Sequence, residues 1–310
     1  MTTINSTPTV TSTATPANLD IVISVVLFKH SLEQQQKIIN ECSQITKNIK
    51  IKIYFVNNRV NNKDNIGDNK DHLAIEYLQN DKNVGFGRAH NLVINKEMGK
   101  TKYFLIMNPD ISFRPQAIEG LFKFMEDDKN MDVGLTIPKI LNPDGSIQFV
   151  NKRLPSPSIF FLRKFFYKTK ISSFRRRLDY YEMRDLNLNQ RIICSNISGC
   201  FMFFRADALK NIAIRNSNPD ENALKCFDER FFLYFEDTDI SRRVSARYKS
   251  VVVSEYEVIH QWERGTHNNF FLLLHTLCSA YKYFNKWGWW KDSEKEILNA
   301  TVGHYRFIGE

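Results

Sequence analysis

Three kinds of feature are scarce or missing in this chain of 310 residues, and each absence excludes a class of protein. No run of apolar residues approaches the roughly eighteen needed to cross a bilayer, so the sequence predicts no membrane-spanning helix. The five cysteines are odd in number and none has C-x-x-C spacing, which argues against a disulfide framework and against a zinc site. We therefore expect a reducing, cytoplasmic environment.

The N-terminal segment lacks the marks of a signal peptide. Residues 1–18, MTTINSTPTVTSTATPAN, have neither a basic start nor an apolar core. We expect them to form a disordered tail.

Acidic side chains are missing from one long segment, residues 152–177. This segment contains nine Lys or Arg, which equals the formal net charge of +9 for the whole chain. Six aromatic residues are interleaved with these charges: Phe160, Phe161, Phe165, Phe166, Tyr167 and Phe174. Such a composition suits an anionic membrane surface or nucleic acid. The structural alternative is a solvated basic helical hairpin whose aromatic side chains lie in the core.

Strand and helix patterns alternate through the first part of the chain. Apolar runs typical of buried strands lie at residues 20–28, 51–56, 75–78 and 103–107. Ser31 and Gln34 form a capping box ahead of apolar residues at helical spacing. Strands that alternate with helices predict an α/β fold, with a mostly parallel sheet covered by helices on both faces.

The tripeptide Asn-Pro-Asp occurs twice, in different surroundings. The copy at 142–144 is followed by Gly145 and lies between two short strand patterns, so we expect it to be only a hairpin turn. The copy at 108–110 follows a buried strand and precedes a helical pattern that begins at Pro115. Open α/β sheets bind ligands at the carboxyl ends of their strands. Asp110 is therefore a candidate functional residue.

Residues 83–91, NVGFGRAHN, place Gly85 and Gly87 at the start of a predicted helix. A dinucleotide fingerprint would need a third glycine and a position after the first strand, and this stretch has neither. Glycines that admit a close backbone approach, followed by Arg88 and a helix N-terminus, still favour an anion. We therefore expect a nucleotide here and not a nicotinamide cofactor.

Carboxylates are most concentrated in residues 227–243, FDERFFLYFEDTDISRR. Asp239 lies four residues before Arg243, which is an ordinary helix pair, so we expect Asp239 to be structural. Glu236 and Asp237 directly follow an apolar run, which places them at a cleft wall where a general base is useful.

Six motifs in the same order and at similar spacing carry a family resemblance. They are VVLF, NVGFGRAHN, YFLIMNPDI, ISGCFMFFRADAL, FDERFFLYFEDTDISRR and HQWERGTHNN, and together they cover roughly residues 20–290. The chain resembles the family 2 glycosyltransferases with the GT-A fold. It is most similar to the bacterial rhamnosyltransferase-like branch, which builds O-antigen in lipopolysaccharide and other cell-surface polysaccharides.

The resemblance implies a role for each matching residue. Asp110 corresponds to the metal-binding aspartate of the family's D-x-D motif, in a site for Mg²⁺ or Mn²⁺. His260 and Arg264 correspond to positions that close over the donor diphosphate, and His260 is also a candidate metal ligand. Asp237 corresponds to the catalytic base, with Glu236 as its companion.

The implied substrate contacts lie at the carboxyl edge of the predicted sheet. The acceptor side corresponds to Ser198 and Gly199. The family usually has Asp-Asn where this chain has Asn57-Asn58, and this departure bears on recognition of the nucleotide base. Asn108 stands where the family often has the first aspartate of the D-x-D motif. The implied donor-binding residues are Val26, Phe28, Asn57, Asn58, Gly85, Gly87, Arg88, Asn91, Asn108, His260 and Arg264.

The resemblance also implies the reaction and the partners. We expect an inverting, metal-dependent transfer of a sugar, with rhamnose suggested, from a dTDP- or UDP-sugar donor to a polyprenyl-diphosphate-linked glycan acceptor. The enzyme would be cytoplasmic and peripheral, held on the inner face of the cytoplasmic membrane by an anionic membrane surface, and nucleic acid is not an expected partner.

The chain is expected to divide into three parts. Residues 1–18 form the tail, and 19–255 form a GT-A (Rossmann-like) domain with a basic aromatic insertion at about 152–190. Residues 256–310 form a C-terminal helical region packed on the catalytic domain. Its aromatic and basic composition favours packing with a membrane-facing side.

Two other functions are compatible with parts of the sequence. A nucleotidyltransferase would share the acidic metal ligands, but it would carry a Gly-rich basic loop after the first strand, and FKHSLEQ lacks one. A non-catalytic glycan- or membrane-binding scaffold would explain Asn57 and Asn108 as decayed contacts.

The remaining histidines have no partner motif in the sequence. We expect His30, His72, His275 and His304 to be surface or packing residues. His90 belongs either to the donor turn or to the core.

Overall fold

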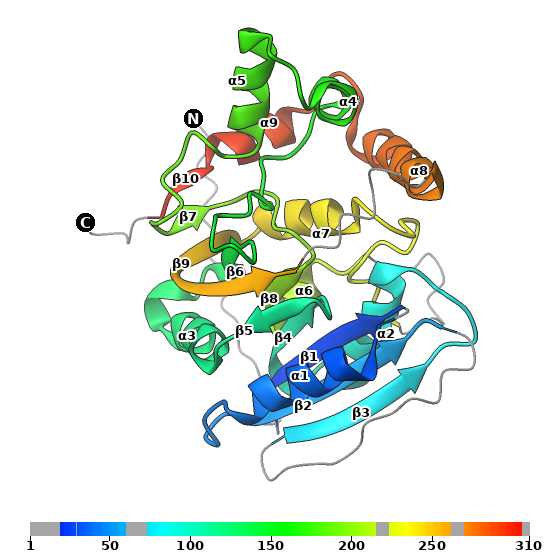
Figure 1. Ribbon diagram of the computed structural model, residues 1–310, viewed down its shortest axis with the longest axis vertical. Coiled ribbons are helices and arrows are strands. Elements are labelled where there is room, and N and C mark those ends of the chain that lie inside the picture. Colours follow the sequence, from blue (N-terminus) through cyan, green and yellow to red (C-terminus); the bar gives the residue numbers. More distant parts are fainter. Residues whose placement is uncertain (1–18, 29, 60–72, 215–222, 262–269, 306–310) are drawn as a thin grey trace, which may run out of the picture.

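The computed structural model describes residues 19–28, 30–59, 73–214, 223–261 and 270–305 (Figure 1). The predicted tail over residues 1–18 lies outside this range. Within it, all strands join one sheet in the order β10-β7-β9-β6-β8-β4-β1-β2-β3, and β5 pairs with β9.

The first half of the chain forms four parallel strands. They are β1 (Leu19–Leu27), β2 (Ile51–Asn57), β3 (Leu73–Gln79) and β4 (Thr101–Met107). Side chains from both faces of β1 are fully buried, for example Ile21, Val22 and Ile23. Burial on both faces explains why this strand is a continuous apolar run and not an alternating one.

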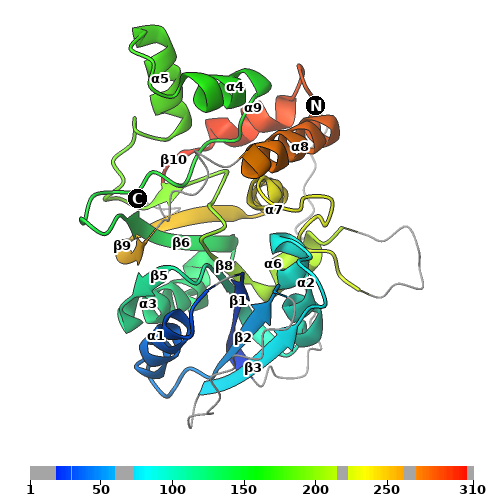
Figure 2. The ribbon, with the colours of Figure 1, turned by 45° about the vertical axis from the view of Figure 1, so that its right-hand side comes forward.

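Helices cover both faces of these strands. Figure 2 shows α1 (Leu32–Ser43) and α3 (Pro115–Glu126) on one side, and α2 (Phe86–Glu97) and α6 (Ala206–Asn211) on the other. The capping box that begins α1 is confirmed, since Ser31 Oγ accepts from Gln34 N and Gln34 Oε1 accepts from Ser31 N. The predicted α/β fold with a mostly parallel sheet is confirmed.

The chain after β4 extends the same sheet with strands of both directions. They are β5 (Ile111–Phe113), β6 (Val133–Leu141), β7 (Ile192–Ile193), β8 (Phe201–Arg205), β9 (Lys249–His260) and β10 (Gly303–His304). β8 is antiparallel to both of its neighbours, β4 and β6, whereas β6 and β9 are parallel. A short 3-10 helix (Asp128–Asn130) precedes β6, and α7 (Glu236–Ser245) precedes β9.

The second Asn-Pro-Asp copy forms the predicted hairpin turn. Gly145 has φ of 81° and donates its N–H to the Asn142 carbonyl at 2.9 Å. Leu141 and Ile147 form an antiparallel bridge on either side of the turn.

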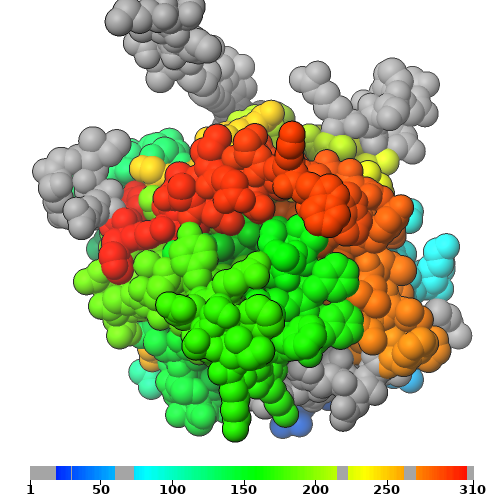
Figure 3. Space-filling model, turned by 90° about the horizontal axis from the view of Figure 1, so that it is seen from above, coloured from blue at the N-terminus to red at the C-terminus, as the bar shows by residue number. Residues whose placement is uncertain are grey.

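Four helices gather beyond α7 at one end of the molecule (Figures 1 and 2). They are α4 (Pro157–Phe166), α5 (Ser172–Tyr181), α8 (Phe270–Trp287) and α9 (Ser293–Ala300). Figure 3 shows the green segment of α4 and α5 beside the orange and red segment of α8 and α9 on one face. No helix in the described ranges is long and apolar enough to span a bilayer.

The basic segment differs from expectation in where its charges and aromatic rings lie. Two of its nine cations are turned inward: Arg153 is buried and paired with Asp185 at 2.8 Å, and Lys152 donates to the Val150 carbonyl at 2.6 Å. Burial, together with nearby Arg163, lowers the pKa of Lys152 to about 8. A hairpin with all of its aromatic rings in the core is wrong, because four rings on and after α4 are exposed: Phe161, Phe165, Phe166 and Tyr167.

The C-terminal helices pack on the loop and helix that carry the acidic motif. Ser279 of α8 donates to the Leu233 carbonyl at 2.8 Å, and Asp292 before α9 pairs with Arg242 of α7. The predicted boundary at residue 255 falls within β9, which continues to His260. The division into catalytic domain and C-terminal region stays a prediction.

Candidate functional site

Asp110 and His260 are 150 positions apart in sequence and adjacent in the fold. β5 and β9 pair antiparallel with Ile111 opposite His260, and Gln261 N donates to the Asp110 carbonyl at 3.0 Å. This register brings the Asp110 Oδ2 and His260 Nε2 atoms to 3.4 Å from each other. The two predicted metal ligands therefore face one another at the end of β4.

The surroundings of this pair leave ligand atoms unused. Among the described residues, Asp110 Oδ1 and His260 Nε2 are buried and have no hydrogen-bond partner. Burial raises the pKa of the Asp110 carboxyl, but the His260 imidazole, when it is protonated, and the nearby His30 lower it by more, so this pKa lies below its usual range. The carboxyl is thus ionised at neutral pH, beside an imidazole nitrogen.

An anionic oxygen and an imidazole nitrogen in contact suit a divalent cation. Two ligands of one octahedral ion with bonds of about 2.1 Å lie about 3 Å apart, which is compatible with this pair. No third His, Cys, Asp or Glu joins them among the described residues. Mg²⁺ in proteins often has only one or two carboxylate ligands, with substrate phosphates and water completing the shell. The residues present fit such a partial site.

Asp237 lies in the first turn of α7 and contacts the predicted acceptor loop. Its Oδ2 accepts from Gly199 N at 3.1 Å, and its Oδ1 accepts from Thr238 N at 2.8 Å. A side chain at Gly199 would place its Cβ only 3.3 Å from the Asp237 Cβ. Asp237 is partly exposed, whereas its neighbours Glu236 and Thr238 are buried. It is therefore the carboxylate of this turn that a substrate can reach.

Glu236 lies in a different electrostatic environment. Burial and the nearby charge of Asp237 raise the pKa of Glu236 well above its ordinary value of 4.5. Its Oε2 atom is buried without a hydrogen-bond partner. Glu236 therefore keeps its proton to a higher pH than an ordinary glutamate, and Asp237 is the more exposed carboxylate of the two.

The segment 198–200 connects the two carboxylate centres. Asn108 N donates to the Cys200 carbonyl at 2.9 Å, and Gly199 contacts Asp237. Burial, with the charges of Asp110 and Asp237, raises the pKa of the Cys200 thiol to about 12. Both carboxylates therefore lie within electrostatic range of one thiol, on either side of the same loop.

Two consecutive residues with left-handed backbone lead into α7. Tyr234 has φ of 68° and Phe235 has φ of 66°, which is unfavourable for bulky side chains. Packing holds this conformation, since the Phe235 ring contacts Tyr283 at 5.1 Å and Phe160 at 5.5 Å between centroids. Rings from the C-terminal helices and the insertion thus set the point at which α7 begins.

The predicted nucleotide side lies where β1, β2 and β3 end. Asn58 N donates to the Leu27 carbonyl at 2.9 Å, and Asn58 Nδ2 donates to the Gly85 carbonyl at 3.1 Å. Asn57 is buried and Phe28 is 44% exposed, while Val26 lies in the core. Most of the predicted donor residues are thus gathered at one edge, and their contact with a nucleotide stays a prediction.

Three residues of the predicted donor turn contact the start of the acidic motif, at Phe227 and Glu229. Asn91 exchanges two 2.9 Å hydrogen bonds with the Phe227 backbone. A Cβ on Gly87 would meet the Phe227 Cβ at 2.8 Å, so glycine is needed for close packing at this position. Arg88 is exposed and lies 3.6 Å from Glu229. Arg88 is the most accessible of the three for a donor phosphate.

Asp239 has more partners than the Arg243 that its helical spacing predicts. It is fully buried, and its carboxylate accepts from Arg243, Lys286 and Trp287 at 2.9, 2.6 and 2.8 Å. These contacts join α7 to α8. The expectation that Asp239 is structural agrees with this geometry.

The locations of the histidines agree only in part with the predictions from the sequence. His30 lies close enough to Asp110 for its charge to lower the pKa of that carboxyl, so it is not a residue remote from the site. His90 is a core residue: it bonds Ser24 Oγ at 2.7 Å, and burial lowers its pKa to about 3. His275 stacks on Phe232, which is a packing role.

One site residue was not predicted from the sequence, and one predicted residue lies outside the described residues. Gln148 contacts His260 Nδ1 at 2.7 Å, and no sequence pattern marks this glutamine except its place after the second Asn-Pro-Asp turn. Arg264, a predicted donor residue, lies outside the described residues.

Residues 34–213 match the model of the family described as glycosyl transferase family 2. The chain is also 25% identical, over 205 residues, to an N-acetylglucosaminyl-diphospho-decaprenol L-rhamnosyltransferase from two strains of Mycobacterium tuberculosis. That match covers 62% of this chain and 60% of the relative. The chain therefore spans about 60% of the length of these curated relatives.

Solved structures share the fold at low sequence identity. GalNAc-T7 in complex with UDP, GalNAc and Mn²⁺ aligns with a TM-score of 0.55 at 12% identity, over 87% of this chain and 48% of that one. S. aureus TarS 1-349 in complex with UDP-GlcNAc aligns with a TM-score of 0.50 at 11% identity, over 91% of this chain and 71% of that one. These likenesses establish the GT-A type of fold.

Proposed function

The chain belongs to glycosyl transferase family 2 and is a glycosyltransferase, and on that basis we propose that it transfers a sugar from a nucleotide-sugar donor to a lipid-linked glycan with inversion. The observation that carries this proposal is the pair of centres joined by residues 198–200. Asp110 with His260 forms one centre, and Asp237 forms the other.

Asp237 is the proposed general base. Its partly exposed carboxylate is held by two backbone N–H groups, so its orientation does not depend on the substrate. It takes the proton from the acceptor hydroxyl as that oxygen attacks the anomeric carbon. The bond from that carbon to the diphosphate oxygen breaks on the opposite face, and the nucleoside diphosphate leaves with the electron pair. One displacement inverts the configuration at carbon.

Asp110 and His260 are the proposed ligands of Mg²⁺ or Mn²⁺. A divalent cation bound there would neutralise charge that develops on the departing diphosphate. Arg88 and the N-terminus of α2 supply positive potential on the nucleotide side. The acceptor loop at Ser198 and Gly199 lies against the base, which suits an acceptor hydroxyl next to Asp237.

The proposed donor and acceptor rest on analogy with the curated relative. Its printed name describes an L-rhamnosyltransferase that acts on a decaprenol-linked diphosphate carrying N-acetylglucosamine. By analogy we propose a dTDP- or UDP-sugar donor, with rhamnose first, and a polyprenyl-diphosphate-linked acceptor. Cell-surface polysaccharide synthesis of the O-antigen type is the corresponding process.

An exposed aromatic face supports a peripheral position on an anionic membrane surface at the cytoplasmic side. Of the 17 large hydrophobic residues that are exposed in the described part of the chain, 12 lie in the segment of α4 and α5 or in the segment of α8 and α9. These segments form one face (Figure 3). Exposed cations accompany them at Lys168, Lys170 and Arg176. Aromatic rings with adjacent cations favour binding at the headgroup boundary.

A transfer assay tests the proposal directly. The protein is incubated with polyprenyl-diphosphate-linked N-acetylglucosamine and, in turn, dTDP-rhamnose and several UDP-sugars, with Mn²⁺ or with EDTA. We expect one donor to be consumed with a product of inverted anomeric configuration, and loss of activity in EDTA. Retained configuration would contradict the base, and full activity in EDTA would contradict the cation site.

A further inference from the structure

We infer that Gln148 is a positioning residue for the cation site: it holds His260 in the tautomer that presents an unprotonated Nε2 to Asp110. This inference rests on the proposed function, because the same two residues are the proposed ligands. It assigns a purpose to the second Asn-Pro-Asp hairpin, which the sequence indicates only as a turn.

Gln148 contacts both the ring and the backbone of His260. Its Oε1 lies 2.7 Å from Nδ1 of the ring, and its Nε2 donates to the His260 carbonyl at 3.4 Å. A backbone carbonyl can only accept, so the nitrogen end of the amide faces it and Oε1 faces the ring. Because Oε1 can only accept, Nδ1 carries the hydrogen, and the neutral imidazole has its lone pair on Nε2.

The hairpin fixes the same amide orientation from the other side. Gln148 Nε2 donates to Asn142 Oδ1 at 2.8 Å, and Asn142 Nδ2 donates to Ser146 Oγ at 2.9 Å. The Ser146 hydroxyl donates to the Asp144 carboxylate at 2.6 Å, and an ionised carboxylate can only accept. Each group's direction therefore follows from its neighbour. The turn and the backbone of β9 select one orientation of Gln148.

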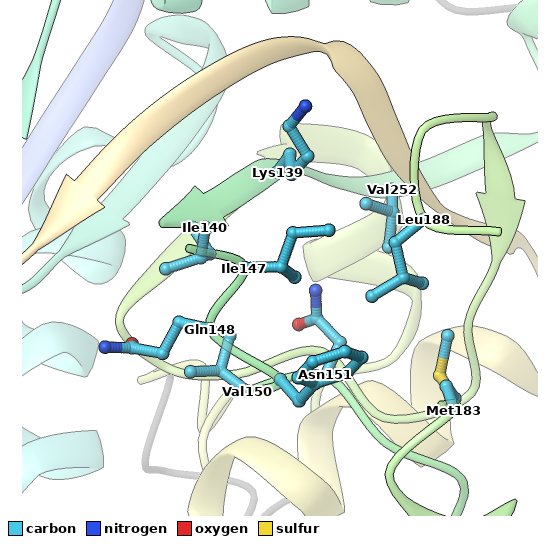
Figure 4. A pocket seen from close by; sticks show the side chains of 10 residues that line it. Lys139, Ile140, Ile147, Gln148, Val150, Asn151, Met183, Leu188 and Val252 are labelled. Atoms are coloured by element: carbon cyan, nitrogen blue, oxygen red, sulfur yellow. The ribbon is translucent and has the colours of Figure 1, made fainter. Parts of the chain in front are cut away.

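Packing on the opposite side of the segment keeps Gln148 in place. Figure 4 shows Ile147 directed into a small pocket toward Leu188, while the Gln148 side chain points away from that pocket. Adjacent residues of an extended segment project to opposite sides. Ile147 thus anchors the segment in apolar surroundings, and Gln148, which is 8% exposed, is committed to His260.

The tautomer matters because, in the other tautomer, the two proposed ligands would bond to each other and would not be available to a cation. With its hydrogen on Nε2, His260 would donate to the Asp110 Oδ2 atom 3.4 Å away, and both ligands would be occupied by each other. With the hydrogen on Nδ1, two lone-pair atoms face each other and favour a cation between them. Hydrogen-bond partners of metal-binding histidines commonly act in this way.

Gln148→Leu and Gln148→Glu form a matched pair of variants. Leucine removes the acceptor, whereas a glutamate carboxylate still accepts from Nδ1. Binding of Mn²⁺ in the presence of dTDP or UDP is followed by the electron paramagnetic resonance of free Mn²⁺. We expect Gln148→Leu to weaken Mn²⁺ binding about 10- to 100-fold. Gln148→Glu keeps the acceptor for Nδ1 but loses the donations to Asn142 and to the His260 carbonyl, so we expect it to weaken binding less than Gln148→Leu does. Thermal unfolding verifies that both variants are folded.

A second measurement reports the tautomer without any metal. ¹⁵N NMR of histidine-labelled protein at a pH where imidazoles are neutral should show His260 protonated at Nδ1 in wild type and Gln148→Glu, and protonated partly at Nε2 in Gln148→Leu. An unchanged tautomer or unchanged Mn²⁺ binding in Gln148→Leu would overturn the inference. If the tautomer shifts as expected but wild type binds no Mn²⁺, the positioning role stands and the proposed metal-dependent function fails instead.

Discussion

At the scale of residues, burial gives the three carboxylates in the first turn of α7 different chemical states. Asp239 is fully buried and contacts two cationic side chains, Lys286 and Arg243. Glu236 is buried, and burial together with the charge of Asp237 raises its pKa well above the ordinary value. Asp237 is partly exposed and receives two backbone hydrogen bonds. A buried charge must be paired or neutralised. This rule distinguishes the structural Asp239, which is buried and paired, from Asp237, the proposed base.

Asp237→Asn should lower turnover by about 10²- to 10⁴-fold with little change in donor affinity. The amide keeps the shape of the side chain but cannot accept the acceptor's proton. Initial rates and nucleotide binding on the same preparation measure both quantities. A variant with nearly full transferase rate would show that another residue is the base.

Asp239→Asn serves as the comparison for Asp237→Asn. It removes the carboxylate partner of Arg243, whereas Lys286 keeps its contact with Asp228 at 2.8 Å, so we expect a loss of folding stability of about 1.5–3 kcal/mol. Turnover per folded molecule should change far less than in Asp237→Asn. Urea unfolding together with initial rates at low temperature distinguishes these effects.

Glu236→Gln should change how stability depends on pH. Between pH 4.5 and its raised pKa, Glu236 keeps in the folded protein a proton that the unfolded chain has released, so wild-type stability falls as pH rises. Glutamine does not titrate. The variant should therefore gain stability over wild type above pH 4.5, by about 1.4 kcal/mol for each unit that separates the two pKa values, and gain nothing below it. Parallel unfolding curves across the pH range would mean that Glu236 is ionised in the folded state.

Asp110→Ala should abolish Mn²⁺-dependent binding of nucleoside diphosphate, because it removes the ionised ligand of the proposed site. Asp144→Ala, in the second copy of the same tripeptide, should leave binding within about threefold of wild type. Asp144 is exposed and water can replace its contact with Ser146, while the His260 carbonyl still orients Gln148. Calorimetry of dTDP and UDP with Mn²⁺ compares the two variants. Equal losses would contradict the assignment of Asp110.

At the scale of elements, the start of α2 and the loop before α7 form one unit. Phe86 N donates to the Phe232 carbonyl at 3.1 Å, and Asn91 holds the Phe227 backbone. Gly85 has φ of 89°, and a Cβ on it would lie 2.5 Å from the Phe232 carbonyl oxygen. The nucleotide side of the site and the base are thus linked through a backbone contact that only glycine allows.

Gly85→Ala should therefore cost more stability than Gly99→Ala. Both positions have positive φ, but a Cβ on Gly99 meets nothing within 4 Å. Gly99→Ala should cost only the backbone strain, about 1–2 kcal/mol, whereas Gly85→Ala adds overpacking of about 1–3 kcal/mol. Denaturant unfolding measures the difference, and turnover should fall in Gly85→Ala alone. Equal stability of the two variants would show that the loop before α7 moves away from the added methyl group without a loss of folding stability.

At the scale of the whole molecule, α4, α5, α8 and α9 share one face (Figure 3), and most of the exposed large hydrophobic residues in the described ranges lie in their segments. Its cations are fewer than the sequence indicates, because Lys152 and Arg153 point inward and Arg175 pairs with Asp179 at 2.7 Å. Its exposed rings are more numerous than a packed hairpin would have. Aromatic insertion should therefore contribute more to membrane binding than charge alone.

Replacing Phe161, Phe165 and Phe166 together with serine should release the protein from anionic liposomes. Transfer to a lipid-linked acceptor should slow, while transfer to a short soluble analogue should not, because the site residues are untouched. Met131→Ser is the control, since Met131 is 57% exposed, as Phe165 and Phe166 are, but follows the 3-10 helix outside this face. Liposome sedimentation measures binding. Absence of wild-type binding, or tight binding to duplex DNA instead, would contradict the membrane proposal.

The sequence by itself determined the features that depend on neighbours along the chain. The capping box of α1, the buried run of β1 and the turn at Gly145 follow from local pattern and backbone preference. Asp110 could be singled out because a carboxylate directly follows a buried strand. The order of short motifs identified the family before any contact was known.

Only the tertiary structure decided which residues meet. His260 faces Asp110 because β5 and β9 pair in one register, and no local pattern specifies that register across 150 residues. The separate pairing of β6 with β9 brings Gln148 to the imidazole, and the packing of Phe235 on Tyr283 sets where Asp237 emerges. Burial also belongs to this level. It depends on the whole fold, and it raises the pKa of Glu236 while the neighbouring Asp237 stays partly exposed.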